Sequence, residues 1–178
     1  ARGSKYIIAV PTDVTEVEKR AFYDLVVHST AKAKEVRIVE RGIADAIGLG
    51  LDVQNEPGIL IANLGAETIE VSILSYGGVV LNKLLKIGSA TIDTNIINSV
   101  RYNQEFLIGK LTAEELRKAF GISNENHIKE LNVAGRNLIT RVPEQKGISV
   151  GLVRAAMKDT IKTCAQEINA LLERTPPE

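Results

Sequence analysis

The stretch GILIANLGAETIEVSILSYGGVV, residues Gly58 to Val80, is the most informative part of the sequence for the fold. Its first part, Ile59–Ala62, is wholly apolar, and Gly65 follows shortly after it. The next part, Thr68–Ser75, alternates between apolar and polar residues, as a strand does when its two faces meet different surroundings. A second glycine turn then leads into another apolar run. The stretch therefore predicts three consecutive strands joined by tight turns.

The turn around Gly65 is the first candidate ligand site. A glycine turn directs several backbone N–H groups into one concavity, which favours anions. In sugar kinases, Hsp70 chaperones and actins, such a hairpin holds the phosphates of ATP, with the usual sequence Asp-x-Gly-Gly-Gly-Thr. Here the same positions read Asn63-Leu64-Gly65-Ala66-Glu67-Thr68. The residues that would handle phosphate and metal are therefore altered, and a plain β-hairpin without a ligand is the alternative.

Two of the changes in this turn concern charge. An Asp at its start would order a water on the metal ion, and Asn63 cannot carry that charge. Glu67 adds a carboxylate where phosphate oxygens would lie. At a separation of ~5 Å and an effective dielectric constant of ~20, this repulsion costs ~3 kcal/mol, which lowers the affinity about a hundredfold. A bound Mg²⁺ would reduce that cost.

A second candidate site follows an earlier predicted strand, in the run VERGIADAIG of residues 39–48. Related ATPases have Glu-Pro at this point, before a helix of small residues, and the Glu orients the attacking water. Arg41 and Gly42 take the places of that Glu and Pro. Glu40 lies next to them, but neighbouring strand residues point to opposite faces. Arg41 and Asn63 thus stand at two substituted catalytic positions; for Arg41, a surface Glu-Arg pair is the alternative.

A third candidate site lies in the run LTAEELR of residues 111–117. Glu114 and Arg117 are three residues apart and share one face of the predicted helix. In a nucleotide-binding relative these two side chains would contact the ribose and the adenine, next to Gly88 and Asp93. A solvated helix face is the alternative.

The whole chain alternates strands and helices, which predicts an α/β fold. A capping box at Thr15–Glu18 and another at Thr112–Glu115 mark the starts of two helices, the second of which ends at Gly121. A third, long helix at Leu152–Leu172 closes the chain. The remaining expected elements are strands at residues 7–10, 36–39 and 79–86, helices at 43–49 and from 92, and weak strands between 127 and 150. The all-apolar run 7–10 suits a strand buried on both faces.

Composition excludes several classes of function. Twenty-two basic and 22 acidic residues balance, so the chain lacks the excess of cations that a broad nucleic-acid or acidic-lipid surface needs. No apolar run reaches the length of a membrane span. A single cysteine forms no intrachain disulfide and fits a reducing, cytoplasmic compartment. We therefore expect no nucleic-acid partner and no membrane contact from this segment.

No metal site is predicted either. His28 and His127 are far apart, and neither has another His or a Cys close to it in the sequence. His28 is expected to end the first helix. Cys164 falls on the apolar stripe of the last helix, which predicts a buried thiol in the core.

Taken together, these stretches resemble the bacterial actins of the MreB type, the rod-shape-determining proteins. The resemblance runs from Tyr6 to Glu178. Its most specific segments are PTDVTEVEKRA at 11–21, Ile108-Gly109 with TAEE at 112–115, and LERTPPE at 172–178. The run LITRVP at 138–143 also resembles a segment of the family. It implies an actin-like ATPase fold of the ribonuclease H type with a smaller inserted α+β subdomain.

On this resemblance, residues 5–91 and 148–178 form the larger lobe, residues 92–147 form the inserted lobe, and residues 1–4 are a cloning scar. The chain would be the C-terminal half of a longer protein. The resemblance further implies cytoplasmic filaments beneath the inner membrane, with ATP and Mg²⁺ bound by the full-length protein. We expect this half alone to bind no cofactor.

The departures from the family pattern predict weakened hydrolysis. Both catalytic positions, Arg41 and Asn63, are changed while the scaffold is kept. The cofactor-contacting set expected from the resemblance is Gly65, Ala66, Glu67, Thr68, Gly88, Asp93, Glu114 and Arg117. The leading hypothesis is a divergent MreB-like cytoskeletal protein. An active actin-like ATPase and an Hsp70-like reactivating or regulatory factor on the same fold are the alternatives.

Overall fold

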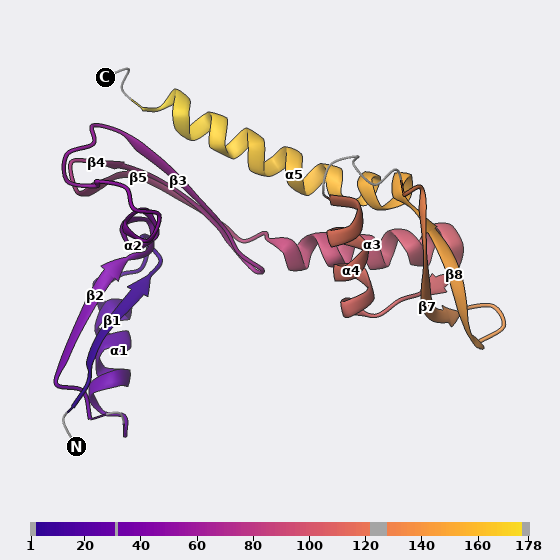
Figure 1. Ribbon diagram of the computed structural model, residues 1–178, viewed down its shortest axis with the longest axis horizontal. Coiled ribbons are helices and arrows are strands. Elements are labelled where there is room, and N and C mark those ends of the chain that lie inside the picture. Colours follow the sequence, from indigo (N-terminus) through magenta and orange to yellow (C-terminus); the bar gives the residue numbers. More distant parts are fainter. Residues whose placement is uncertain (1–2, 31, 122–127, 176–178) are drawn as a thin grey trace. The chain divides into compact units, whose positions relative to one another are not determined.

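The computed structural model describes residues 3–30, 32–121 and 128–175 (Figure 1). It confirms the alternation of strands and helices. The elements are β1 (Lys5–Val10), α1 (Glu16–Val27), β2 (Glu35–Glu40), α2 (Arg41–Gly48), β3 (Ile59–Leu64), β4 (Ile69–Ser75), β5 (Gly78–Leu85), α3 (Ser89–Gln104), β6 (Phe106–Leu107), α4 (Lys110–Gly121), β7 (Glu130–Asn137), β8 (Pro143–Ser149) and α5 (Val150–Glu173).

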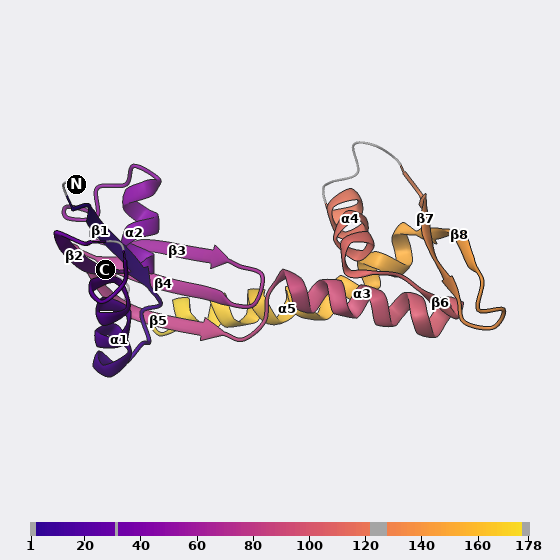
Figure 2. The same ribbon diagram turned by 90° about the horizontal axis from the view of Figure 1, so that it is seen from below.

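The strands form three sheets. The stretch from Gly58 to Val80 folds as predicted into the antiparallel sheet β3–β4–β5 (Figure 2), and its first turn joins Leu64 to Ile69. Strands β1 and β2 pair in parallel with each other. Strands β6, β7 and β8 form a second antiparallel sheet of three strands.

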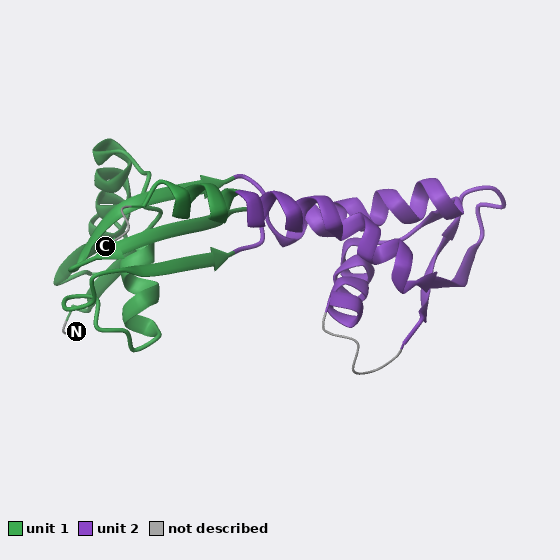
Figure 3. Cartoon of the chain, turned by 90° about the horizontal axis from the view of Figure 1, so that it is seen from above, with its two compact units in different colours: residues 1–64, 68–85, 167–178 green, residues 65–67, 86–166 purple. Residues whose placement is uncertain are grey.

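The chain divides into two compact units (Figure 3). Unit 1 comprises residues 1–64, 68–85 and 167–178, and unit 2 comprises residues 65–67 and 86–166. Unit 2 therefore begins earlier and ends later than the predicted lobe of residues 92–147. The assignment of these lobes to parts of an actin-type protein stays a prediction.

Each unit has its own hydrophobic core. In unit 1, α2 packs on the antiparallel sheet around Ala46, Val53, Ile61 and Leu74. In unit 2, α3, α4 and the first part of α5 pack on the second antiparallel sheet. Its largest fully buried side chains are Phe106, Ile96, Leu116 and Ile148. Burying such side chains is the main force that holds each unit together.

The expected burial of β1 on both faces is wrong. The side chain of Ile7 is 75% exposed, and β1 pairs only with β2 among the described residues. None of the residues of α1 is buried. An apolar run permits burial on both faces, but burial requires an element to cover each face, and the described structure covers these faces only in part.

The two predicted capping boxes have different outcomes. At α1 the box forms as expected: Thr15 Oγ1 accepts from the Glu18 N–H at 3.2 Å, and Glu18 Oε2 accepts from the Thr15 N–H at 2.8 Å. The box at Thr112 does not form, because α4 already begins at Lys110 and the Ala113 N–H donates to the Gly109 carbonyl at 3.0 Å.

The long helix α5 buries only part of its predicted stripe. Val153, Met157 and Leu171 are buried, but Ile161 is exposed and Cys164 is half-buried. The expectation of a core thiol at Cys164 is therefore wrong, because the described part of the chain covers this stretch of the helix on one side only. His28 ends α1 as predicted. His127 lies outside the described residues.

Candidate functional site

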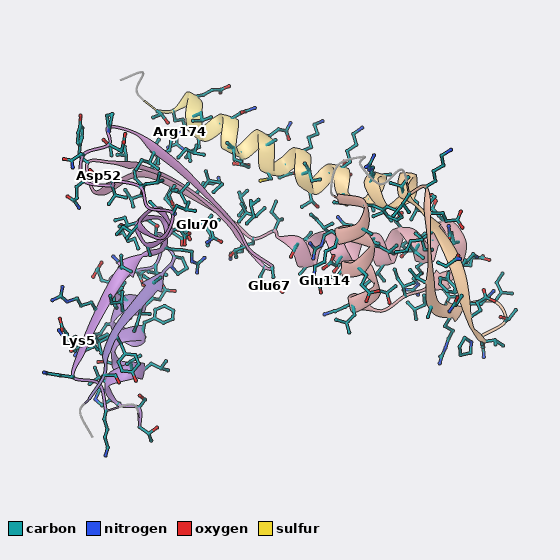
Figure 4. The ribbon with its side chains drawn as sticks, viewed as in Figure 1. Lys5, Asp52, Glu67, Glu70, Glu114 and Arg174 are labelled. Atoms are coloured by element: carbon teal, nitrogen blue, oxygen red, sulfur yellow. The ribbon has the colours of Figure 1, made fainter. Side chains whose placement is uncertain are left out.

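The candidate catalytic positions of unit 1, Arg41 and Asn63, lie around one buried carboxylate. This is the carboxylate of Glu70 on β4, which is labelled in Figure 4. Strand β4 is buried along nearly its whole length, polar face included. The side chain of Glu70 is only 2% exposed. Its Oε1 accepts from the Thr12 N–H at 2.8 Å, and its Oε2 lies 3.3 Å from Nη1 of Arg41. The buried charge is therefore ion-paired through Oε2 and hydrogen-bonded through Oε1, although Oε2 accepts no hydrogen bond among the described residues.

Helix α2 brings Arg41 to this carboxylate. Arg41 is the first residue of α2, which follows β2 without a loop, and its side chain is 28% exposed. The sequence-based alternative of a surface Glu-Arg pair with Glu40 does not describe this geometry. At the position where the resemblance places a water-orienting Glu, the chain has the guanidinium of Arg41, which neutralises the carboxylate of Glu70 on β4.

Asn63 occupies the same cluster. It lies directly opposite Glu70 in the β3–β4 ladder. Directly opposite residues project from the same face of a sheet. Nδ2 of Asn63 donates to Oδ2 of Asp45 at 2.7 Å. Arg41 and Asp45 are four residues apart and share a face of α2. One face of α2 thus lies over the pair Asn63 and Glu70 and supplies each with a polar partner.

The turn of the hairpin lies in unit 2, against the start of α3. The carbonyls of Gly65 and Ala66 accept from the N–H groups of Ser89 and Ala90, at 3.1 and 2.9 Å. A Cβ on Gly88 would come within 2.2 Å of the Ala66 carbonyl oxygen, so only glycine permits this close approach. The turn therefore satisfies first-turn donors of α3 that an anion would otherwise use.

Glu67 and Glu114, both labelled in Figure 4, line a pocket of about 580 Å³ in unit 2. Asp93 and Lys110 also line it. Glu67 is exposed and has no ion pair among the described residues. Lys118 donates to the Glu114 carboxylate at 2.7 Å, which holds the pKa of Glu114 below its usual value. Because Glu67 is exposed, solvent and salt would screen part of its repulsion of a phosphate.

Two further predicted contact residues, Asp93 and Arg117, pair with each other. Nε of Arg117 donates to Oδ1 of Asp93 at 2.6 Å, and its Nη2 donates to Oδ2 at 3.4 Å. This hydrogen-bonded pairing raises the pKa of Arg117 above its usual value. The structure therefore joins Asp93 to Arg117 across α3 and α4, so the alternative of a freely solvated helix face does not apply to Arg117.

The structure thus separates the predicted residues into two groups. Arg41, Asn63 and Thr68 belong to unit 1; Gly65, Ala66, Glu67, Gly88, Asp93, Glu114 and Arg117 belong to unit 2. Sequence reasoning did not single out Glu70 or Asp45. The one available signal was that Glu70 is the only charged residue in the predicted strand Thr68–Ser75. Such a residue usually needs a partner.

The whole chain, residues 1–178, matches the family model for MreB/Mbl proteins. This chain belongs to the MreB/Mbl family. The cell shape-determining protein MreB of Escherichia coli K12 is 33% identical over 175 residues, which cover 98% of this chain and 50% of that protein. The cell shape-determining protein Mbl of Bacillus subtilis 168 is 26% identical, with coverage of 98% and 52%. The chain spans about half the length of these curated MreB/Mbl relatives.

Solved structures confirm the actin-like fold. The crystal structure of MreB5 of Spiroplasma citri bound to AMPPNP has a TM-score of 0.90 and 26% identity, and the match covers 98% of this chain and 52% of that one. The ADP-bound form of the same protein gives a TM-score of 0.88 at 27% identity. A double helical filament of MamK shares the fold at a TM-score of 0.72 and 17% identity.

Among the described residues, no group of three or more His, Cys, Asp or Glu side chains could hold a metal ion. No helix in the part of the chain that the structure describes is long and apolar enough to cross a membrane.

Proposed function

We propose that this chain is one half of a filament-forming, MreB-type cytoskeletal protein that acts in cell shape and hydrolyses ATP weakly or not at all. Membership of the MreB/Mbl family and relatives named as cell shape-determining support the cytoskeletal part. The MreB5 structures bound to AMPPNP and to ADP support nucleotide binding by the longer protein, and the proposal adds Mg²⁺ to the bound ATP. The longer protein is then cytoplasmic and lies beneath the membrane, and its main partners are other copies of itself in the filament.

The observation that supports weak hydrolysis is that Arg41 and Asn63 are each paired with another side chain of unit 1. Hydrolysis of a phosphoanhydride needs a group that orients water and a charge that orders the metal's water shell. Arg41 is engaged with Glu70 at 3.3 Å, and Asn63 is engaged with Asp45 at 2.7 Å. A cation and a neutral amide, each engaged with a protein partner, supply neither function.

The test is phosphate release by the full-length protein, measured together with sedimentation of its filaments. We expect filaments in the presence of ATP and phosphate release near the background rate. Filaments with rapid release would support the ordinary ATPase alternative. Absence of filaments at any nucleotide or protein concentration would contradict the cytoskeletal proposal.

The 178-residue chain alone should not bind ATP measurably by titration calorimetry. The predicted contact residues Asp93 and Arg117 already satisfy each other, and Glu67 presents a carboxylate to the pocket it lines. The variant Glu67→Gln provides the matched comparison, since it removes that charge and keeps the size of the side chain. Micromolar affinity of the unmodified chain would contradict this prediction.

A further inference from the structure

A groove in unit 2 combines an apolar floor with a basic rim. It has a volume of about 640 Å³ and lies between the end of α4 and one face of α5, which are side by side in Figures 1 and 2. Nothing in the weak-hydrolysis proposal uses it. Its lining includes Phe120 and Gly121 from α4, and Arg154, Met157, Lys158, Ile161 and Lys162 from α5.

The floor of the groove is continuous with the core of unit 2. Phe120 and Met157 are buried members of that core. Ile161 continues the same stripe of α5 one turn further on, yet its side chain is 53% exposed. Ala155 and Ala165, also in the lining, are exposed and small. The groove therefore exposes apolar surface while leaving room for the side chains of another element.

Among the described residues that line the groove, every charged side chain is cationic. Arg154, Lys158 and Lys162 follow each other at intervals of four residues, so they form a row along α5. Arg154 donates to the Phe120 carbonyl at 3.3 Å, which fixes it at the edge of the floor. Lys158 and Lys162 are exposed and form no ion pair within residues 3–30, 32–121 and 128–175. A chain with no net charge thus concentrates positive charge at this groove.

We propose that the groove binds an amphipathic helix of a partner protein, with an apolar stripe flanked by Asp or Glu side chains. An apolar stripe laid into an apolar groove is an established mode of helix recognition. The row of cations then selects a partner with carboxylates beside the stripe and speeds its association. A flat bilayer would reach the rim but not the concave floor, so a helix fits the shape better than a lipid surface.

The test uses the 178-residue chain and a fluorescent probe peptide of about 14 residues, ~21 Å long as a helix. The peptide has leucines at positions i, i+3, i+4 and i+7, flanked by glutamates. We expect saturable binding in fluorescence anisotropy that weakens as salt is raised. The double variant Lys158→Glu/Lys162→Glu should weaken it about tenfold or more, since it replaces two attractions by two repulsions. Ile161→Ser should weaken it about fivefold or more by removing apolar contact.

The matched control is Lys86→Glu/Lys129→Glu, which makes the same charge change at exposed sites of unit 2 outside the groove. It should leave binding within about twofold of the unmodified chain. Equal loss in the control, equal binding of a peptide with lysines in place of the glutamates, or no saturable binding would overturn the proposal. Tighter binding to anionic vesicles, abolished by the groove variant but not by the control, would also overturn the proposal and would indicate a lipid surface. Self-association of the chain, abolished by the groove variant but not by the control, would overturn it too and would indicate a second copy of this chain.

Discussion

Replacing Arg41 by Met should lower the free energy of unfolding by about 3 kcal/mol, because it leaves the Glu70 carboxylate buried without its cation. Glu70 is buried on β4; its Oε1 accepts from the Thr12 N–H, whereas its Oε2 has no hydrogen bond among the described residues and only the Arg41 ion pair offsets its charge there. In a chain of this size, such a loss lowers the Tm by about 6–12 °C. Urea and thermal unfolding followed by circular dichroism would measure both quantities.

Two controls make this prediction specific. Arg37→Met breaks the Arg37–Glu35 pair on β2, where the Arg37 side chain is 75% exposed, and should cost under about 1 kcal/mol. Adding Glu70→Gln to Arg41→Met should recover much of the lost stability, since the amide is neutral. If Arg41→Met lowers the free energy of unfolding no more than Arg37→Met does, the Glu70 charge is not neutralised by Arg41. The same conclusion follows if adding Glu70→Gln recovers none of the lost free energy.

In the full-length protein, the combined change Arg41→Glu, Asn63→Asp and Glu67→Gly should raise phosphate release by about a hundredfold or more, and by more than the single changes together. Each reversal restores one element: a water-orienting carboxylate, the charge that orders the metal's water shell, or a turn free of a competing carboxylate. Groups that act as a unit in catalysis fail together, so no single reversal should restore turnover.

The contacts of Arg41 add a condition to this experiment. Arg41→Glu alone would place a second carboxylate beside Oε2 of Glu70, where 3.3 Å now separates opposite charges. This variant should therefore be less stable than the parent protein as well as inactive. Arg41→Gln avoids the repulsion and still offers a group that can orient water, as Gln does in GTPases. We expect the combination with Gln to regain part of the activity with a smaller loss of stability.

Release rates should be measured with stability on the same samples. If both combined variants fold and remain at the parent rate, the substitutions at Arg41, Asn63 and Glu67 do not cause the weak hydrolysis. Rapid release by the parent protein would instead refute weak hydrolysis itself and leave an active ATPase that uses other residues.

Local patterns in the sequence were sufficient for most elements of the fold, although the two-residue strand β6 was not predicted. The strands of β3–β4–β5 followed from apolar runs, alternation and glycine turns, and α1 followed from the capping box at Thr15. These signals act over a few residues, so they can be recognised without knowing what lies on either side in space. The false start at Thr112 marks the limit: the same pattern inside a helix that has already begun at Lys110 forms no cap.

Only the tertiary structure decided which polar groups meet. Arg41 and Glu70 are separated in the sequence by the rest of α2, a loop and strand β3. Asn63 meets Asp45 because strand register sets it opposite Glu70, beneath α2. It also decided that Cys164 is half-buried and that Ile161 is exposed. Periodicity shows which residues share a face of a helix or strand, but burial and pairing depend on which other element packs against that face.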